Sequence, residues 1–156
     1  MSTVKADSPG VIIFPPLLYL GFFLFGLLVH WLVPVQPLPV AYARGLGLFL
    51  LAVSSVLTVW AIVTLRRSGT NVHPSKPALA VVTRGPYRWT RNPMYLAFAV
   101  VYAGLSLLIP ALAPLVLLPL LLALVEWGVI RREERYMAAK FGEPYLAYKA
   151  QVRRWL

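Results

Sequence analysis

Long stretches without a charged residue constrain this chain more than any other feature. No Lys, Arg, Asp or Glu occurs from Val11 to Val33, from Gly45 to Leu65, or from Pro93 to Val125. The first two runs are 23 and 21 residues long, and a helix that crosses a hydrocarbon core of roughly 30 Å needs about 20 residues. Because 60% of the 156 residues are apolar and only 13% are charged, a soluble globular domain is excluded: so small a chain cannot bury that much apolar surface.

The third uncharged run is 33 residues long, which is too long for one helix and short for two. Pro110 and Pro114 lie near its middle, where a tight turn would divide it, and the second helix can continue to Ile130. We therefore expect an all-α integral membrane protein with four transmembrane helices, at about residues 11–33, 45–65, 93–109 and 111–130.

The basic residues predict the orientation of these helices. Residues 66–92 carry six basic residues and no acid, and residues 131–156 carry seven. Two spans between these segments place both on one side of the membrane, which the positive-inside rule makes the cytoplasm. We expect a single multi-pass domain, residues 1–156, in a bacterial inner membrane, with both termini cytoplasmic. The net charge of +10 does not indicate nucleic-acid binding, because 14 of the 15 basic residues would face anionic headgroups on the cytoplasmic side.

The two cytoplasmic segments have the composition of a binding region. Prolines at positions 74, 77, 86 and 93 discourage a helix in the loop 66–92 and favour an extended, ligand-binding segment packed on the helices. In the tail 131–156, Gly142 and Pro144 interrupt the helix that follows the fourth span. A C-terminal amphipathic helix then carries Tyr145, Tyr148, Val152 and Trp155 on one face, suited to the membrane interface or to folding back over the loop.

Several kinds of site are not expected. The chain has no cysteine and only two histidines, 43 positions apart, so we expect no metal centre. No Rossmann fingerprint is present either: Gly45-Leu46-Gly47 lacks the third glycine and lies in a membrane span. Any nucleotide-like cofactor would have to bind in a site of the membrane type.

Two sequence blocks carry the chemistry. The first is Gly85-x-Tyr87-x3-Arg91-Asn92-Pro93-Met94-Tyr95, and the second, two spans later, is Glu133-Glu134-x6-Phe141-Gly142-x2-Tyr145-x2-Tyr148. Together they resemble the signature of the isoprenylcysteine carboxyl methyltransferase family, to which the membrane phospholipid methyltransferases are related. The resemblance covers about residues 69–156.

This resemblance implies that S-adenosylmethionine binds in a cytoplasmic pocket formed by the loop and the C-terminal segment. The implied cofactor-binding residues are Val81, Val82, Tyr87, Asn92, Pro93, Met94, Tyr95 and Glu133. The implied catalytic residues are Arg91, Asn92 and Glu134. The family has a histidine where this chain has Asn92, which can still donate and accept hydrogen bonds but cannot act as a general base.

The residue types suit this cofactor on chemical grounds as well. Methyl transfer from a sulfonium is an in-line displacement, so the protein mainly supplies positioning and a dry site. The cofactor's ammonium and ribose hydroxyls suit Glu133 or Glu134, its carboxylate suits Arg91 or backbone N–H groups, and its adenine suits a tyrosine ring. By charge and placement, we expect Arg131 and Arg132 to bind an acidic acceptor.

The leading hypothesis is a membrane methyltransferase that methylates a lipophilic acceptor, such as an isoprenylcysteine-like carboxylate or another small lipid, at the cytoplasmic interface. A phospholipid amine methyltransferase is an alternative. A non-catalytic membrane scaffold is a second alternative, and the asparagine at position 92 in place of the family histidine favours it. Taken singly, Glu133 and Glu134 could form a surface ion-pair network and the arginines could bind headgroups. The expected partners are a lipophilic or prenylated substrate and membrane lipids; the acceptor and the oligomeric state stay open.

Overall fold

The computed structural model describes residues 10, 14–36, 38–73 and 76–156, and in this part of the chain every regular element is a helix. Three helices are long and apolar enough to cross a membrane: α1 (Pro15–Leu32), α2 (Val40–Arg67) and a continuous helix from Leu112 to Phe141. A fourth apolar helix, α3 (Pro93–Leu108), has 16 residues. The all-helical class expected from the sequence is confirmed. The number of spans and their orientation remain predictions.

The 30-residue helix consists of three parts: α4 (Leu112–Val125), a single π turn η2 (Glu126–Ile130) and α5 (Arg131–Phe141). Its apolar first part becomes strongly charged in α5. Single π turns inside α-helices often occur at functional sites. The helix continues beyond the apolar run and carries Glu133 and Glu134 to the end of the bundle.

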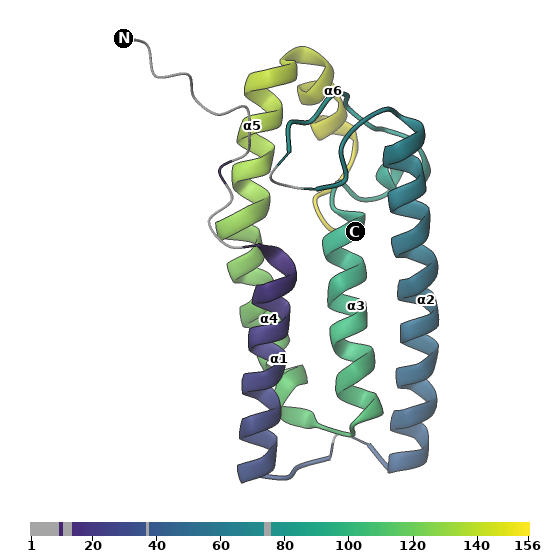
Figure 1. Ribbon diagram of the computed structural model, residues 1–156, viewed down its shortest axis with the longest axis vertical. Coiled ribbons are helices and arrows are strands. Elements are labelled where there is room, and N and C mark those ends of the chain that lie inside the picture. The colour runs from purple at the N-terminus through teal and green to yellow at the C-terminus, as the bar shows by residue number, and fades with distance from the viewer. Residues whose placement is uncertain (1–9, 11–13, 37, 74–75) are drawn as a thin grey trace.

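The helices form a bundle in which the functional segments gather at one end (Figure 1). α1 packs along α4, and α3 contacts α1, α2 and α4. Short connections between α1 and α2 and between α3 and α4 lie at one end of the bundle. The loop 68–92, α5, α6 (Glu143–Gln151) and the C-terminus lie at the other end. The two sequence blocks therefore meet at the same end of the molecule.

Small residues bring α2 and α3 close together. A Cβ atom on Gly47 would lie 2.7 Å from the carbonyl oxygen of Gly104, so only glycine fits there. Seven residues further along α2, the Ser54 hydroxyl donates a 2.9 Å hydrogen bond to the carbonyl oxygen of Ala97. Because the backbones approach so closely, α2 and α3 are held in register with each other.

The observed boundaries differ in detail from those expected. The turn at Pro110 is confirmed, since α3 ends at Leu108 and α4 begins at Leu112. α2 begins at Val40 rather than near residue 45, where the uncharged run starts, so the helix includes Arg44; arginine is a good helix former with a long stem. Residues 11–13 of the first expected span and Pro74 of the loop lie outside the described residues.

The C-terminal helix is shorter than expected. α6 ends at Gln151, and Val152 is extended (φ −115°, ψ 133°), so the expected helical face through Val152 and Trp155 is wrong. The chain leaves the helix there because the backbone carbonyls of Arg153 and Arg154 accept hydrogen bonds from the loop instead. The Tyr148 hydroxyl donates a 2.7 Å hydrogen bond to the carbonyl oxygen of Tyr87. The sequence suits this helix either to the membrane interface or to a position over the loop. In the structure α6 folds back over the loop.

Candidate functional site

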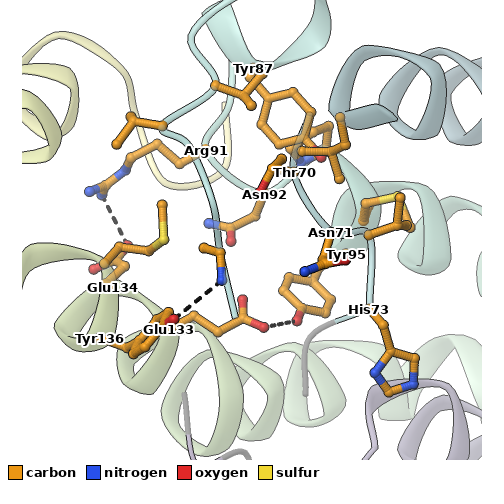
Figure 2. A pocket seen from close by; sticks show the side chains of 18 of the residues that line it. Thr70, Asn71, His73, Tyr87, Arg91, Asn92, Tyr95, Glu133, Glu134 and Tyr136 are labelled. Carbon is orange, nitrogen blue, oxygen red and sulfur yellow. Dashed lines mark hydrogen bonds and ion pairs between the residues drawn. The ribbon is translucent and has the colours of Figure 1, made fainter. Parts of the chain in front are cut away.

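A cavity of about 440 Å³ lies at the end of the bundle that holds the loop 68–92, α5 and α6. Its wall combines the start of α1, the loop segments 70–73 and 76–82, the short 3₁₀ helix η1 (Gly85–Arg88), the start of α3, and faces of α5 and α6. Pockets that bind small molecules typically measure roughly 300–1,000 Å³ and are mostly apolar with a few polar groups. The cavity fits that description, and Figure 2 shows its polar side chains.

The structure brings both sequence blocks to this cavity. Every residue assigned to the cofactor lines it, as does every residue assigned to catalysis; these are Val81, Val82, Tyr87, Arg91, Asn92, Pro93, Met94, Tyr95, Glu133 and Glu134. In Figure 2 Asn92 and Tyr95 come from the loop and α3, and Glu133 and Glu134 come from α5 on the facing side. Their common location is a finding, while the individual roles assigned to them stay predictions.

Local sequence explains how the loop reaches this position. Gly85 has φ +61°, and a Cβ atom on it would lie 2.6 Å from the Thr64 hydroxyl oxygen, so the turn that starts η1 requires glycine. Val82 and Tyr87 are buried against Ala61 of α2. The extended segment 79–82 therefore packs on the helices without pairing as a strand in the described part of the chain, as the sequence predicts.

Asn92 lies where the loop becomes α3. It precedes Pro93, the first residue of that helix, where the missing N–H of proline costs nothing. Its side-chain amide is buried and donates a 3.0 Å hydrogen bond to the carbonyl oxygen of Arg154. The residue that replaces the family histidine is therefore bonded to the C-terminal tail as well as lining the cavity.

Glu133 is an acid without a cationic partner. Its Oε1 atom accepts a 2.6 Å hydrogen bond from the Tyr95 hydroxyl, and no Lys or Arg of the described residues pairs with it. Burial raises the pKa of the Glu133 carboxyl to about 7, and the bond from Tyr95 offsets only part of that effect. This carboxylate can therefore pair with a cationic group of a ligand in the cavity.

Glu134, the next residue, has the opposite environment. Burial opposes its ionisation, but Arg154, Arg91 and Lys149 outweigh that effect and hold the pKa of the Glu134 carboxyl below its usual range. Arg154 binds both carboxylate oxygens at 2.8 and 2.9 Å, while Nη2 of Arg91 lies 3.3 Å from Oε1. The environments of the two adjacent acids thus shift the two pKa values in opposite directions, upward for Glu133 and downward for Glu134.

Arg91 carries unsatisfied donors. Its side chain is 9% exposed, and its Nε and Nη1 atoms are buried without a hydrogen-bond partner among the described residues. A buried donor left without an acceptor costs about 1–3 kcal/mol. An anionic group of a ligand at this wall of the cavity would lower that cost.

The structure does not place Arg131 or Arg132 on the cavity wall. Nη2 of Arg131, whose side chain is 49% exposed, lies 2.9 Å from Oε1 of Glu126. Nη1 of Arg132 lies 3.5 Å from the carbonyl oxygen of Gly10. Their predicted role in binding an acidic acceptor is thus separate from the cavity and stays a prediction.

Sequence reasoning missed part of the wall. Thr70, Asn71 and Tyr136 line the cavity and also order the loop over it. The Thr70 hydroxyl accepts a 2.9 Å bond from the Leu79 N–H, and the Tyr136 hydroxyl accepts a 3.2 Å bond from the Ala78 N–H. The available signal was the position of Tyr136, three residues after Glu133 and hence on the same helix face.

Comparison with known proteins gives a family match and short matches to curated relatives. A family model described as phospholipid methyltransferase matches residues 42–144. The cobalt-zinc-cadmium resistance protein CzcN of Cupriavidus metallidurans is 38% identical over 63 residues, which are 40% of this chain and 29% of that protein. An uncharacterized protein of Haemophilus influenzae is 59% identical over 27 residues, which are 17% of this chain and 43% of that protein.

The chain spans less than half the length of each of these two curated relatives. No solved structure matches the chain. The match to the family model extends from early α2 into the start of α6, so it covers the first sequence block and the second block as far as residue 144.

Proposed function

The chain belongs to the phospholipid methyltransferase family, and from that premise we propose that its cavity binds S-adenosylmethionine and serves methyl transfer to a lipophilic acceptor. The family, which is related to the isoprenylcysteine carboxyl methyltransferases, makes the protein a membrane methyltransferase in general terms. The proposal adds the cofactor, its site, and the location of that site at the cytoplasmic membrane interface.

One observation carries the proposal: the loop block and the α5 block, separated by two apolar helices in the sequence, line one cavity. A scaffold would not need both blocks to converge on a cavity of ligand size. The site also suits a ligand with separated charges, because among the described residues Glu133 has no cationic partner and two buried donors of Arg91 have no acceptor.

The cavity residues fit the parts of S-adenosylmethionine. Glu133 would hold the ammonium or ribose hydroxyls, Arg91 would hold the carboxylate, and the Tyr87 ring with Val81 and Val82 offers an apolar surface for the adenine. When bound, this cofactor supplies a methyl group on a sulfonium, which an acceptor's lone pair displaces in line. The chain's own residues exclude water and fix the two reactants, which is what this reaction most requires.

Asn92 limits the kind of acceptor. The amide cannot take up a proton, so this residue does not activate an acceptor that must first be deprotonated. A carboxylate already has the lone pair that the reaction needs, whereas a phospholipid amine is protonated at neutral pH and must first lose its proton to solvent or to another base. The family description favours the phospholipid amine, and the related family favours an isoprenylcysteine-like carboxylate, so both are retained as acceptor classes.

We further propose that α3 spans the membrane together with the three longer helices, with both termini cytoplasmic and in a bacterial inner membrane. The 16 residues of α3 extend about 24 Å at 1.5 Å per residue, and the charged segments at one end of the bundle agree with this orientation. Arg131 and Arg132 would then lie near the headgroups, where an acidic acceptor can approach from the bilayer.

Transfer of a labelled methyl group tests the proposal. The purified protein is reconstituted in liposomes with methyl-labelled S-adenosylmethionine and either phosphatidylethanolamine or a prenylated cysteine. We expect the wild type to transfer label to one of the two lipid classes, and we expect Glu133→Gln to lose this transfer. Glu143→Gln, which removes an exposed acid outside the cavity, should retain it. Absence of S-adenosylmethionine binding in the folded wild type would contradict the proposal.

A further inference from the structure

The loop that precedes α3 is bonded to the last residues of the chain. The Arg91 N–H donates a 3.0 Å hydrogen bond to the carbonyl oxygen of Arg153. The Thr90 hydroxyl and the Asn92 side-chain amide each donate a 3.0 Å bond to the carbonyl oxygen of Arg154. Residues 90–92 belong to no helix or strand, and each of them donates one of these bonds to the tail.

The side chain of Arg154 anchors that tail to the long helix on the other side of the cavity. Its Nε and Nη2 atoms bind the two carboxylate oxygens of Glu134 at 2.8 and 2.9 Å, and its Nη1 atom binds Oε1 of Glu126 at 2.8 Å. The indole N–H of Trp155 donates a 3.1 Å bond to Oε2 of Glu126. One arginine therefore joins α5, η2 and the loop, with its guanidinium on the helix and its carbonyl on the loop.

The same bonds fix the orientation of the Asn92 amide. A backbone carbonyl can only accept a hydrogen bond, so the side-chain nitrogen of Asn92 must face Arg154. Asn92 also lines the cavity, so the tail holds the side chain that stands where the family has a histidine.

We propose that Arg154 is a positioning residue for the methyl-transfer site. It is not among the described residues that line the cavity, yet through its carbonyl and guanidinium it holds Thr90 and Asn92, the two neighbours of Arg91 in the chain, at their distance from Glu134. The charge of Arg154 has a second effect. Because Arg154 also pairs with Glu134, this carboxylate does not depend on the guanidinium of Arg91 alone for a positive partner. This inference rests on the proposed function.

Hydrogen–deuterium exchange of the full-length protein in detergent tests, without any ligand, whether Arg154 holds the loop in place. In Arg154→Gln we expect backbone amides in peptides covering residues 87–92 to exchange at least about tenfold faster, although residue 154 is distant in sequence. Arg135→Gln is the matched control, because it removes the same charge from an exposed position on α5, next to Glu134. We expect exchange in the control to equal that of the wild type.

Titration with S-adenosylhomocysteine tests the functional part in the same three proteins. We expect the Kd of Arg154→Gln to rise about tenfold, which corresponds to about 1.4 kcal/mol. Arg135→Gln should bind within about twofold of the wild type. If Arg154→Gln does not fold, Glu126→Gln replaces it, because Glu126 bonds to Arg154 and Trp155 but does not line the cavity.

The outcomes separate this inference from the proposed function. Faster loop exchange together with weaker binding supports the positioning role. Unchanged exchange overturns it, and so does faster exchange with unchanged Kd, because the tail would then be structural only. Absence of binding in the folded wild type overturns the proposed function, and with it the positioning role, while the exchange data still decide whether Arg154 holds the loop.

Discussion

Tyr95 donates a 2.6 Å hydrogen bond to Oε1 of Glu133, although 38 residues separate them in the chain. The donor lies in the first turn of α3 and the acceptor in the first turn of α5. This bond joins the two sequence blocks across the cavity, and Figure 2 shows both side chains at its wall. It is also the bond that holds the Glu133 carboxylate in place.

Replacement of Tyr95 by Phe tests the value of that bond. Phe keeps the ring and removes the only described donor to Glu133, so we expect the affinity for S-adenosylhomocysteine to fall about tenfold, or about 1.4 kcal/mol. Calorimetric titration measures the change. Tyr102→Phe is the control, because the Tyr102 hydroxyl is buried without a partner among the described residues, and its loss should leave affinity unchanged.

The elevated pKa of Glu133 predicts a pH dependence of ligand binding. With a pKa of about 7, the carboxylate is half ionised at pH 7 and about one-tenth ionised at pH 6. If the ionised form binds the ligand's ammonium, the affinity should fall about fivefold between pH 7 and pH 6 and level off above pH 8. In Glu133→Gln this dependence should disappear; a wild-type affinity that is constant over this range would contradict the pairing.

The same shift has a defined effect on stability. The folded state holds the Glu133 proton more tightly than the unfolded chain, whose glutamate has an ordinary pKa of 4.5. The stabilisation from this group is therefore complete below pH 4.5 and is lost as pH rises through about 7. Ligand affinity and the stability of the free protein should thus change in opposite directions over this range.

The sequence predicted where the two blocks meet but not how the tail holds them. Tyr87, Asn92 and Glu133 were assigned to one pocket because their spacing resembles a family signature, and all three line the cavity. Arg154 carried no such signal. Its role depends on the reversal of the chain at Gly142 (φ +59°), which brings the tail back beside the loop.

Other differences follow from short-range preferences that the wider structure overrides. The regular spacing of Tyr145, Tyr148, Val152 and Trp155 suggested one helical face, but tail carbonyls that bond to the loop end the helix at Gln151. The prolines of the loop 66–92 predict a binding segment, while the contact of Ala78 with Tyr136 is a long-range one. Local pattern does not specify such contacts.

Gly85 offers a test of the loop's attachment to α2. Gly85→Ala places a Cβ atom 2.6 Å from the Thr64 hydroxyl oxygen and forces φ +61° on alanine, whereas Gly69→Ala has φ +69° and open space around the Cβ atom. Both variants should lose about 1–2 kcal/mol for the left-handed conformation. Thermal unfolding should show a larger loss for Gly85→Ala, and only that variant should also weaken ligand binding. Equal losses would mean that the contact with Thr64 is unimportant.

The double variant Arg131→Gln/Arg132→Gln tests the proposed site for an acidic acceptor. Both side chains lie outside the cavity, so the KM for S-adenosylmethionine should stay unchanged. We expect the KM for a carboxylate or phosphate-bearing acceptor to rise about threefold to tenfold, since two partly exposed charges each contribute up to about 1 kcal/mol. An unchanged acceptor KM would remove these residues from the proposed site.

Binding of S-adenosylhomocysteine to the detergent-purified protein tests the central claim most directly. Calorimetric titration compares the wild type with Glu133→Ala and with Glu143→Ala, whose acid is exposed at the start of α6. We predict micromolar affinity for the wild type and for Glu143→Ala, and at least tenfold weaker binding for Glu133→Ala. No binding to a wild type shown to be folded by circular dichroism, or equal binding to all three proteins, would contradict a cofactor site at this cavity.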